Sequence, residues 1–148
     1  MPVVTHHRVL AIDVGERRVG LAISDASATL ARPLFTLVVQ GVADAAEKVV
    51  RELERLASEE DGLSAIVVGR PLRLDGSPSP ATSGVDAFVT ALRARTRLPI
   101  SWEDERLTSR EAEARLAVRE RDWRQRKKKL DAAAAAIILQ DFLDRPRQ

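Results

Sequence analysis

The order of short apolar runs and helical patterns along the chain is the feature that most constrains its fold. Three apolar runs come first, at residues 9–12, 19–23 and 34–39, with only short connections between them. Such connections predict an antiparallel three-stranded meander. Two later runs, at residues 65–68 and 98–102, each follow a segment with helical periodicity. Because strands that alternate with helices pair in parallel, the sequence predicts an α/β fold with a mixed five-stranded sheet flanked by helices.

Helices are predicted where apolar residues recur at intervals of three and four. The segments with this pattern are about residues 41–62, 85–92, 109–116 and 131–143. Residues 69–82 contain several glycines, prolines and serines, so they are predicted to form a loop.

The length and composition of the chain exclude several classes of protein. A chain of 148 residues with no repeat and no linker is expected to form a single domain over residues 1–148, with a disordered start at residues 1–7. The absence of cysteine excludes thiol catalysis, thiolate zinc sites and disulfide frameworks. No stretch approaches the roughly 20 apolar residues of a membrane span, and the N-terminus lacks the apolar core of a signal peptide. We therefore expect a cytoplasmic protein with no membrane partner.

Basic charge is concentrated in one part of the chain. The whole chain carries a net charge of only +2, but residues 106–129 contain ten basic and four acidic residues. A local stripe of this kind can attract the phosphate backbone of a nucleic acid. The alternative is a solvated helix face, which is the commoner use of such a run. Trp102 and Trp123 also have two interpretations, stacking on bases or packing in the core.

Acidic residues end two of the predicted strands and begin the last predicted helix. Asp13 ends the first apolar run, the acidic residues 103–105 end the fifth, and Asp131 begins the helix. Ligands of open α/β sheets collect at the carboxyl ends of strands, so these acids are expected to lie close together. Carboxylates that share a small volume repel one another unless a cation neutralises them, and oxygen ligands suit Mg²⁺ or Mn²⁺. Two such ions about 4 Å apart can activate a water for attack on a phosphodiester.

Each of these acids also has a structural interpretation. Asp13 precedes Gly15 and could form a turn, whereas Asp131 could be the N-cap of the last helix. Residues 103–105 could form a solvated strand end. The combination of three acids at these positions favours a metal site over three separate structural roles.

Four segments of the chain, taken in order, resemble motifs of the YqgF/RuvX family. The family's members are described as Holliday junction resolvases and as pre-16S rRNA nucleases. The matching segments are residues 13–22, which begin Asp-Val-Gly, the glycine–proline segment 68–77, the Asp-Glu-Arg segment 104–109, and residues 131–140 of the last helix. Together they span nearly the whole chain, which makes the resemblance far more specific than an isolated Asp-x-Gly.

The resemblance implies an RNase H-like fold and a nuclease that depends on Mg²⁺ or Mn²⁺, with two ions bound. It also implies that Asp13, Glu105 and Asp131 are both the catalytic residues and the metal ligands. Spacing alone does not choose between neighbouring acids, but the family pattern favours Glu105, with Asp104 as the second choice. The implied partner is nucleic acid, either a DNA junction or single strand or an rRNA precursor, and junction cleavage would suit a homodimer.

Basic residues and glycines near these motifs complete the predicted site. The candidates for contact with nucleic acid are Arg18, Arg70, Arg73, Arg106, Lys127, Lys128 and Lys129. The candidates for shaping loops around the site are Gly15, Gly20, Gly69, Pro71 and Gly76. Arg70, Arg73 and Glu16 depart from the family pattern; the two arginines could add phosphate contacts, and Glu16 adds negative charge near the proposed metals.

Two other functions are compatible with the same fold. An ATP-handling protein of the actin and sugar-kinase type shares an Asp-x-Gly hairpin, but such proteins need two domains around the nucleotide. A non-catalytic RNA-binding factor in ribosome assembly is the second alternative, because a fold does not determine a function. The presence of all three acids favours the nuclease.

Overall fold

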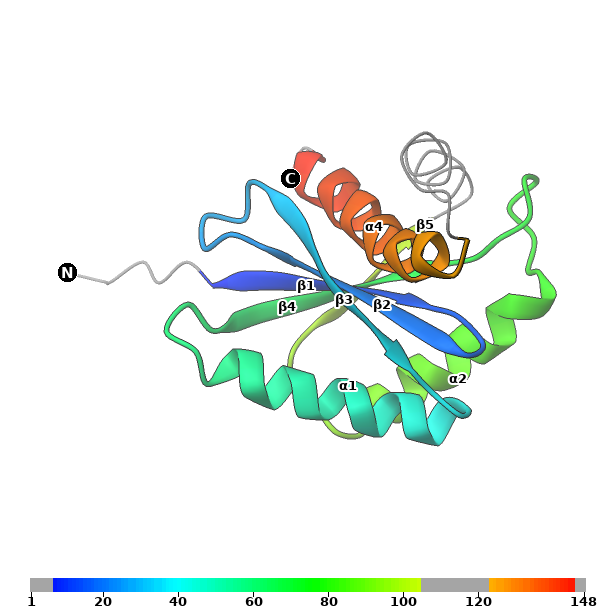
Figure 1. Ribbon diagram of the computed structural model, residues 1–148, viewed down its shortest axis with the longest axis horizontal. Helices are drawn as coiled ribbons and strands as arrows, with labels where there is room; N and C mark the ends of the chain where they lie inside the picture. Colours follow the sequence, from blue (N-terminus) through cyan, green and yellow to red (C-terminus); the bar gives the residue numbers. More distant parts are fainter. Residues whose placement is uncertain (1–6, 105–122, 146–148) are drawn as a thin grey trace.

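The computed structural model of the chain describes residues 7–104 and 123–145, with side chains for 7–104 and 132–145. Five strands form one sheet in the order β3-β2-β1-β4-β5 (Figure 1). Their bounds are β1 Arg8–Val14, β2 Arg18–Ser24, β3 Ala31–Val38, β4 Leu63–Arg70 and β5 Ile100–Asp104. β2 is antiparallel to β1 and β3, whereas β4 is parallel to β1 and β5. The predicted mixed sheet is therefore confirmed.

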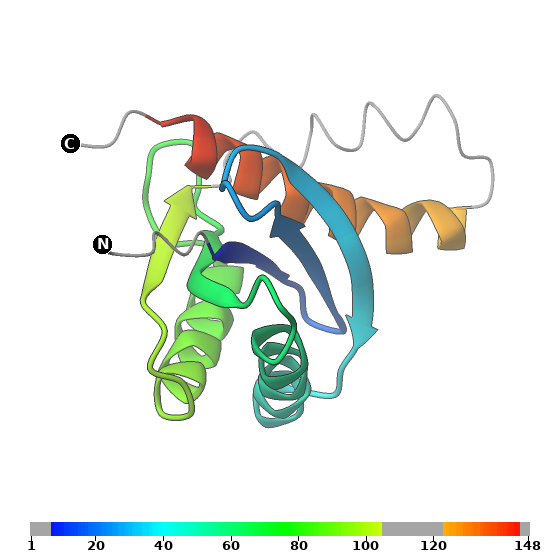
Figure 2. The ribbon, with the colours of Figure 1, turned by 90° about the vertical axis from the view of Figure 1, so that its left-hand side faces the viewer.

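Helices cover both faces of the sheet. Helices α1 (Val42–Ala57) and α2 (Pro80–Arg93) lie on one face, and α4 (Trp123–Asp144) crosses the other (Figure 2). Within the part of the chain that the structure describes, no helix is long and apolar enough to span a membrane.

Alternate residues of the central strands belong to two separate hydrophobic cores, one on each face of the sheet. Leu10 and Ile12 of β1 pack with the buried side chains of α1 and α2. Val9 and Ala11 pack on the opposite face with Ile138 and its neighbours in α4. Because side chains alternate along a strand, a strand with helices on both faces is apolar at nearly every position. This requirement explains the continuous apolar runs that the sequence shows.

Several element boundaries differ from the sequence prediction, and those of β4, β5 and α4 bear on the site. β4 and β5 extend beyond their last apolar residues, because the parallel ladder continues through the pairs Gly69–Glu103 and Arg70–Asp104. Backbone hydrogen bonding tolerates polar side chains at strand ends, which an apolar pattern does not detect. Helix α4 begins at Trp123, eight residues before its predicted start. The helix predicted at 109–116 lies outside the described residues.

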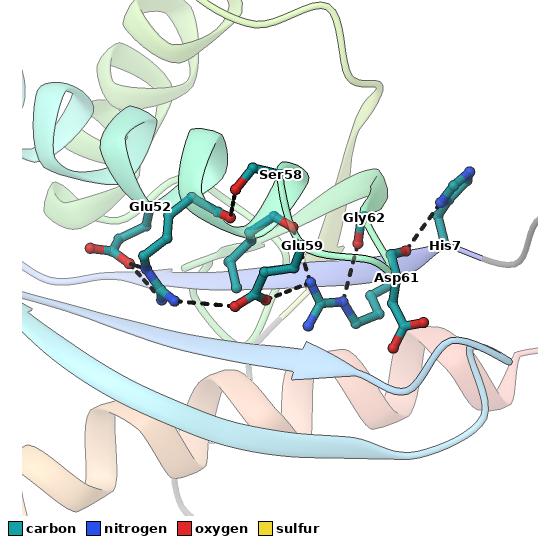
Figure 3. A network of polar contacts seen from close by, with 9 residues as sticks. His7, Glu52, Ser58, Glu59, Asp61 and Gly62 are labelled. Carbon is teal, nitrogen blue, oxygen red and sulfur yellow. Dashed lines mark hydrogen bonds and ion pairs between the residues drawn. The ribbon is translucent and has the colours of Figure 1, made fainter.

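A buried arginine, Arg8, joins the start of β1 to the end of α1. Figure 3 shows its partners Glu59 and Gly62 beside His7 and Asp61. Arg8 is only 8% exposed. It donates hydrogen bonds to the carbonyl oxygens of Leu56 (3.0 Å) and Gly62 (3.1 Å) and pairs with Glu59 at 2.9 Å. Nδ1 of His7 lies 3.1 Å from the carbonyl oxygen of Asp61. These contacts fix the first strand against the segment that leads into β4. Residues 1–6 lie outside the part of the chain that the structure describes.

The turn between β2 and β3 carries a pH-dependent contact. Oδ1 of Asp25 accepts hydrogen bonds from the backbone N–H groups of Thr29 (2.8 Å) and Leu30 (3.2 Å). These bonds hold the pKa of Asp25 below its ordinary value of 3.8. A lowered carboxyl pKa adds stability above the ordinary value, and that stability is lost as the pH falls through the lower value. We expect wild type to melt slightly above Asp25→Asn at pH 7, with the difference vanishing at strongly acid pH. Thermal melts of both proteins from pH 7 to pH 2 check this; a constant difference contradicts it.

Candidate active site

The carboxyl ends of three parallel strands meet at one edge of the sheet. Asp13 is the penultimate residue of β1, Gly69 is the penultimate residue of β4, and Asp104 ends β5. In the register of the sheet Ile12 lies beside Val68, so one residue further along brings Asp13 beside Gly69. This edge is where ligands collect in sheets of this kind.

Asp13 lies between two glycines on the face of the sheet that α4 covers. Asp13 is half-buried, and its parity with Val9 and Ala11 puts it on the face of the sheet that α4 covers. Its partner on β2 is Gly20, and its neighbour on β4 is Gly69. Both flanking positions therefore lack a side chain. The structure places these two glycines inside strands rather than in the loops that the sequence predicted.

Asp104 and Arg70 lie on the opposite face. They are partners in the register of β4 and β5, on the side where Trp102 packs against the core formed with α1 and α2. The guanidinium of Arg70 lies 5.3 Å from the Trp102 ring centroid and pairs with Asp86 of α2 at 3.3 Å. The predicted phosphate contact by Arg70 therefore competes with two contacts inside the protein, and Trp102 packs partly in the core, as one of its two interpretations predicted.

Glu103 is a buried carboxylate that the sequence analysis did not distinguish from its neighbours. It is 1% exposed, and its Oε2 accepts a bond from Arg145, just beyond the end of α4. Burial raises its pKa, and the negative charges of Asp141 and Asp104 act in the same direction, whereas Arg145 opposes them. The alternation of side chains along β5 could have identified it from the sequence. Glu103 directly follows Trp102, so the two side chains must lie on opposite faces of the sheet.

The remaining predicted carboxylates are described only in part. Glu105 and Arg106 lie outside the described residues. Asp131 lies within α4, eight residues after its first residue, so its interpretation as a helix N-cap is wrong. Position 131 falls four residues before Ala135 and seven before Ile138, on the side of the helix that packs on the sheet. Both views show α4 beginning toward the end of the sheet where β1 turns into β2 (Figures 1 and 2).

The predicted loop residues form two tight turns at this edge. Gly15 donates a hydrogen bond to the carbonyl oxygen of Arg18 at 2.7 Å, so a β-carbon at position 15 would clash with that oxygen. In the loop between β4 and α2, Gly76 has a φ of 88° and donates to the carbonyl oxygen of Arg73. The hydroxyl of Thr82 donates to the carbonyl oxygen of Pro71 at 2.5 Å and ties the loop to α2.

The basic candidates are spread around the same edge. Arg18 begins β2, and Arg73 lies in the loop, where its Nε donates to the carbonyl oxygen of Pro78 at 3.0 Å. The positions of Lys127, Lys128 and Lys129 fall in the first half of α4, where side chains lie outside the described part of the chain.

Comparisons with known proteins agree with this arrangement. Among solved structures, the chain resembles Thermus thermophilus RuvC in complex with a Holliday junction substrate, with a TM-score of 0.55 and 18% identity over 94% of this chain and 97% of that one. This likeness shows an RNase H-like fold. A protein of Chloroflexus aggregans named "Putative pre-16S rRNA nuclease" is 41% identical over 94% of both chains. A protein of the same name from Roseiflexus sp. is 39% identical over 95% of this chain and 96% of its own.

A family profile covers the same region. The profile described as RuvX, Holliday junction resolvase, matches residues 7–145, which include every strand and helix described above. With relatives near 40% identity over almost the full length, the assignment does not depend on one motif. The chain belongs to the RuvX family of Holliday junction resolvases.

Proposed function

We propose that this RuvX-family nuclease cleaves phosphodiester bonds with two divalent ions, Mg²⁺ or Mn²⁺, held by Asp13, Glu105 and Asp131. The observation that carries the proposal is the position of Asp13: it is the penultimate residue of the central strand, lies on the α4 face, and has glycine on both neighbouring strands. An RNase H-like nuclease fold depends on divalent metal in general, and this site supplies the oxygen ligands that such ions prefer.

The chemistry of the residues around Asp13 fits a divalent ion. Asp13 offers carboxylate oxygens, and the glycines at positions 20 and 69 place no cationic side chain beside it that would compete with a metal. When bound, the ions would activate a water and stabilise the leaving oxygen. Within residues 7–104 and 132–145, no group of three or more potential ligands could hold a metal, and two proposed ligands lie outside those side chains.

Strand parity supports Glu105 over Asp104 as the third ligand. Asp104 shares its face of the sheet with Trp102, whereas Asp13 shares the α4 face with Glu103. One further extended residue would return the chain to the face of Asp13. The position of Asp131 on the sheet-facing side of α4 supports its proposed place as the second ligand, and Glu103 with Arg145 ties the end of that helix to β5.

The substrate we propose is structured nucleic acid, either a four-way DNA junction or the precursor of 16S rRNA. The description of the matching family profile supports the junction, and the names of the relatives support the RNA. Both substrates occur in the cytoplasm, where we propose that the protein acts. On a junction we expect a two-fold dimer, because two strands must be cut symmetrically.

The test is cleavage of three labelled substrates: a four-way DNA junction, single-stranded DNA, and an RNA that spans the 5′ end of 16S rRNA. Each is incubated with Mg²⁺, Mn²⁺ or EDTA. We expect cleavage with metal, none in EDTA, and recovery when metal is restored. The preferred substrate separates junction resolution from RNA processing. Binding without cleavage in every metal condition would contradict the nuclease and favour the non-catalytic assembly factor.

A further inference from the structure

A cavity of about 520 Å³ lies beside the proposed active site, on the other face of the sheet. It opens to the surface and is lined by the turn that follows β1 and by the first turns of α1 and α2. The proposed catalytic chemistry uses none of the residues that line it. Its volume falls in the range of sites that hold small organic groups.

The chemistry of the cavity wall is apolar with one charge. Val14, Val42, Val85 and Phe88 contribute apolar wall, and Val42 is one of the few large apolar side chains that are exposed in the described part of the chain. Among the residues that the structure describes, Glu16 is the only charged one that lines the cavity, and no basic residue does. A phosphate group would therefore meet the negative charge of Glu16 and no basic side chain. A flat apolar group with a hydrogen-bond donor at its edge would find both wall and acceptor.

The cavity adjoins Asp13 along the chain. Val14, Gly15 and Glu16 line the cavity and follow Asp13 directly. The end of β1 therefore contributes both to the proposed metal site and to the cavity. The first turn of α1 also lines the cavity, and its N-cap residue, Gly41, supplies no side-chain cap. The positive end of that helix therefore favours an electron-rich ring nitrogen or carbonyl.

We propose that the cavity receives one unpaired base of the nucleic-acid substrate, at a nucleotide next to the cleaved phosphate. The inference rests on the proposed nuclease function and adds a base-binding subsite to it. A base in a duplex is stacked and cannot enter a cavity, so the subsite selects a nucleotide that is single-stranded, at a junction or flipped out. The carboxylate of Glu16 accepts a hydrogen bond from an exocyclic amino group, which favours cytosine, adenine or guanine over uracil or thymine.

One glycine in the wall allows the cavity to be filled without disturbing the fold. A β-carbon at Gly84 meets no atom within 4 Å, and its φ lies outside the positive range. Gly41 has a φ of 92°, and a β-carbon at Gly15 would clash, so neither is suitable. Gly84 lies inside α2, where a larger residue has better helix propensity. Gly84→Leu should therefore fold and fill the cavity; Ala87→Leu, at an exposed position of the same helix outside the cavity, is the matched control.

The experiment scans single abasic positions through each strand of the cleaved substrate. With the wild-type protein, we expect an abasic site at one position beside the cut to raise the apparent KM about tenfold. The dissociation constant measured in EDTA should rise by the same factor. Gly84→Leu should show the same tenfold loss with the intact substrate and no further loss with the abasic one. Ala87→Leu should match wild type, and melting curves establish that both variants fold. Glu16→Gln should reduce the preference for an amino-bearing base at the sensitive position.

The outcomes separate this inference from the proposed function. An abasic scan without any sensitive position overturns the subsite, even if cleavage is normal. A sensitive position whose penalty persists in Gly84→Leu also overturns it, because the base then binds elsewhere. If no substrate is cleaved but binding in EDTA shows the sensitive position and its loss in Gly84→Leu, the nuclease proposal fails and the base site stands.

Discussion

Asp13→Asn is expected to reduce cleavage by at least about a thousandfold, which corresponds to about 4 kcal/mol of activation free energy. Asparagine keeps the size and one oxygen of the side chain but removes the charge that binds a divalent ion. Because glycines flank Asp13 on both neighbouring strands, no nearby side chain from those positions can replace its carboxylate. The measurement is the rate of metal-dependent cleavage under single-turnover conditions, with binding of the same substrate measured in EDTA.

The matched control for this variant is Asp25→Asn at the other end of β2. Asp25 is exposed in the turn that leads to β3, far along the sheet from Gly20. Its substitution should leave the cleavage rate within about twofold of wild type. Equal rates for wild type and Asp13→Asn would remove Asp13 from the metal site and with it the main support for the proposed chemistry.

Arg8→Met is expected to lower the free energy of unfolding by about 3 kcal/mol, the largest stability effect that we predict. Methionine retains much of the apolar stem but leaves the carbonyl groups of Leu56 and Gly62 short of a donor in a buried place. It also removes the ion pair with Glu59. The loss would appear as a lower urea midpoint with an unchanged slope.

Arg51→Met separates this effect from the loss of any arginine. The side chain of Arg51 is 71% exposed and pairs with Glu47 of the same helix at 2.8 Å. Exposed pairs of this type contribute about 0.5 kcal/mol or less. Similar losses in both variants would mean that burial of Arg8 has no special effect on stability.

The sequence predicted the sheet because its apolar runs reflect a physical requirement. β1 and β4 are covered by helices on both faces, so almost every residue in them must be apolar. The order of runs and helices then leaves few topologies, and the family motifs select one of them. Polar residues at strand ends, such as Glu103 and Asp104, were beyond this reasoning, because hydrogen bonds to the backbone hold them in the ladder.

The sequence predicted which residues belong to the candidate site. It did not predict on which face of the sheet each of them lies. Asp13 and Asp104 both follow apolar runs, yet they lie on opposite faces of the sheet, because strand register and parity, rather than composition, determine the face. The engagement of Arg70 with Asp86 and Trp102 depends on a contact between two elements distant in the sequence. The cavity beside Val14 likewise depends on how α1 and α2 approach each other.

The position of α4 has a consequence for synthesis of the protein on the ribosome. The central strand is made first, but the apolar face formed by Val9, Ala11 and Val67 is covered only when the last helix has been translated. A chain that stops before α4 would expose this face and tend to aggregate. The same helix contains Asp131, so the proposed nuclease site also stays incomplete until this helix has been made. Completion of the core and completion of the proposed site would therefore coincide.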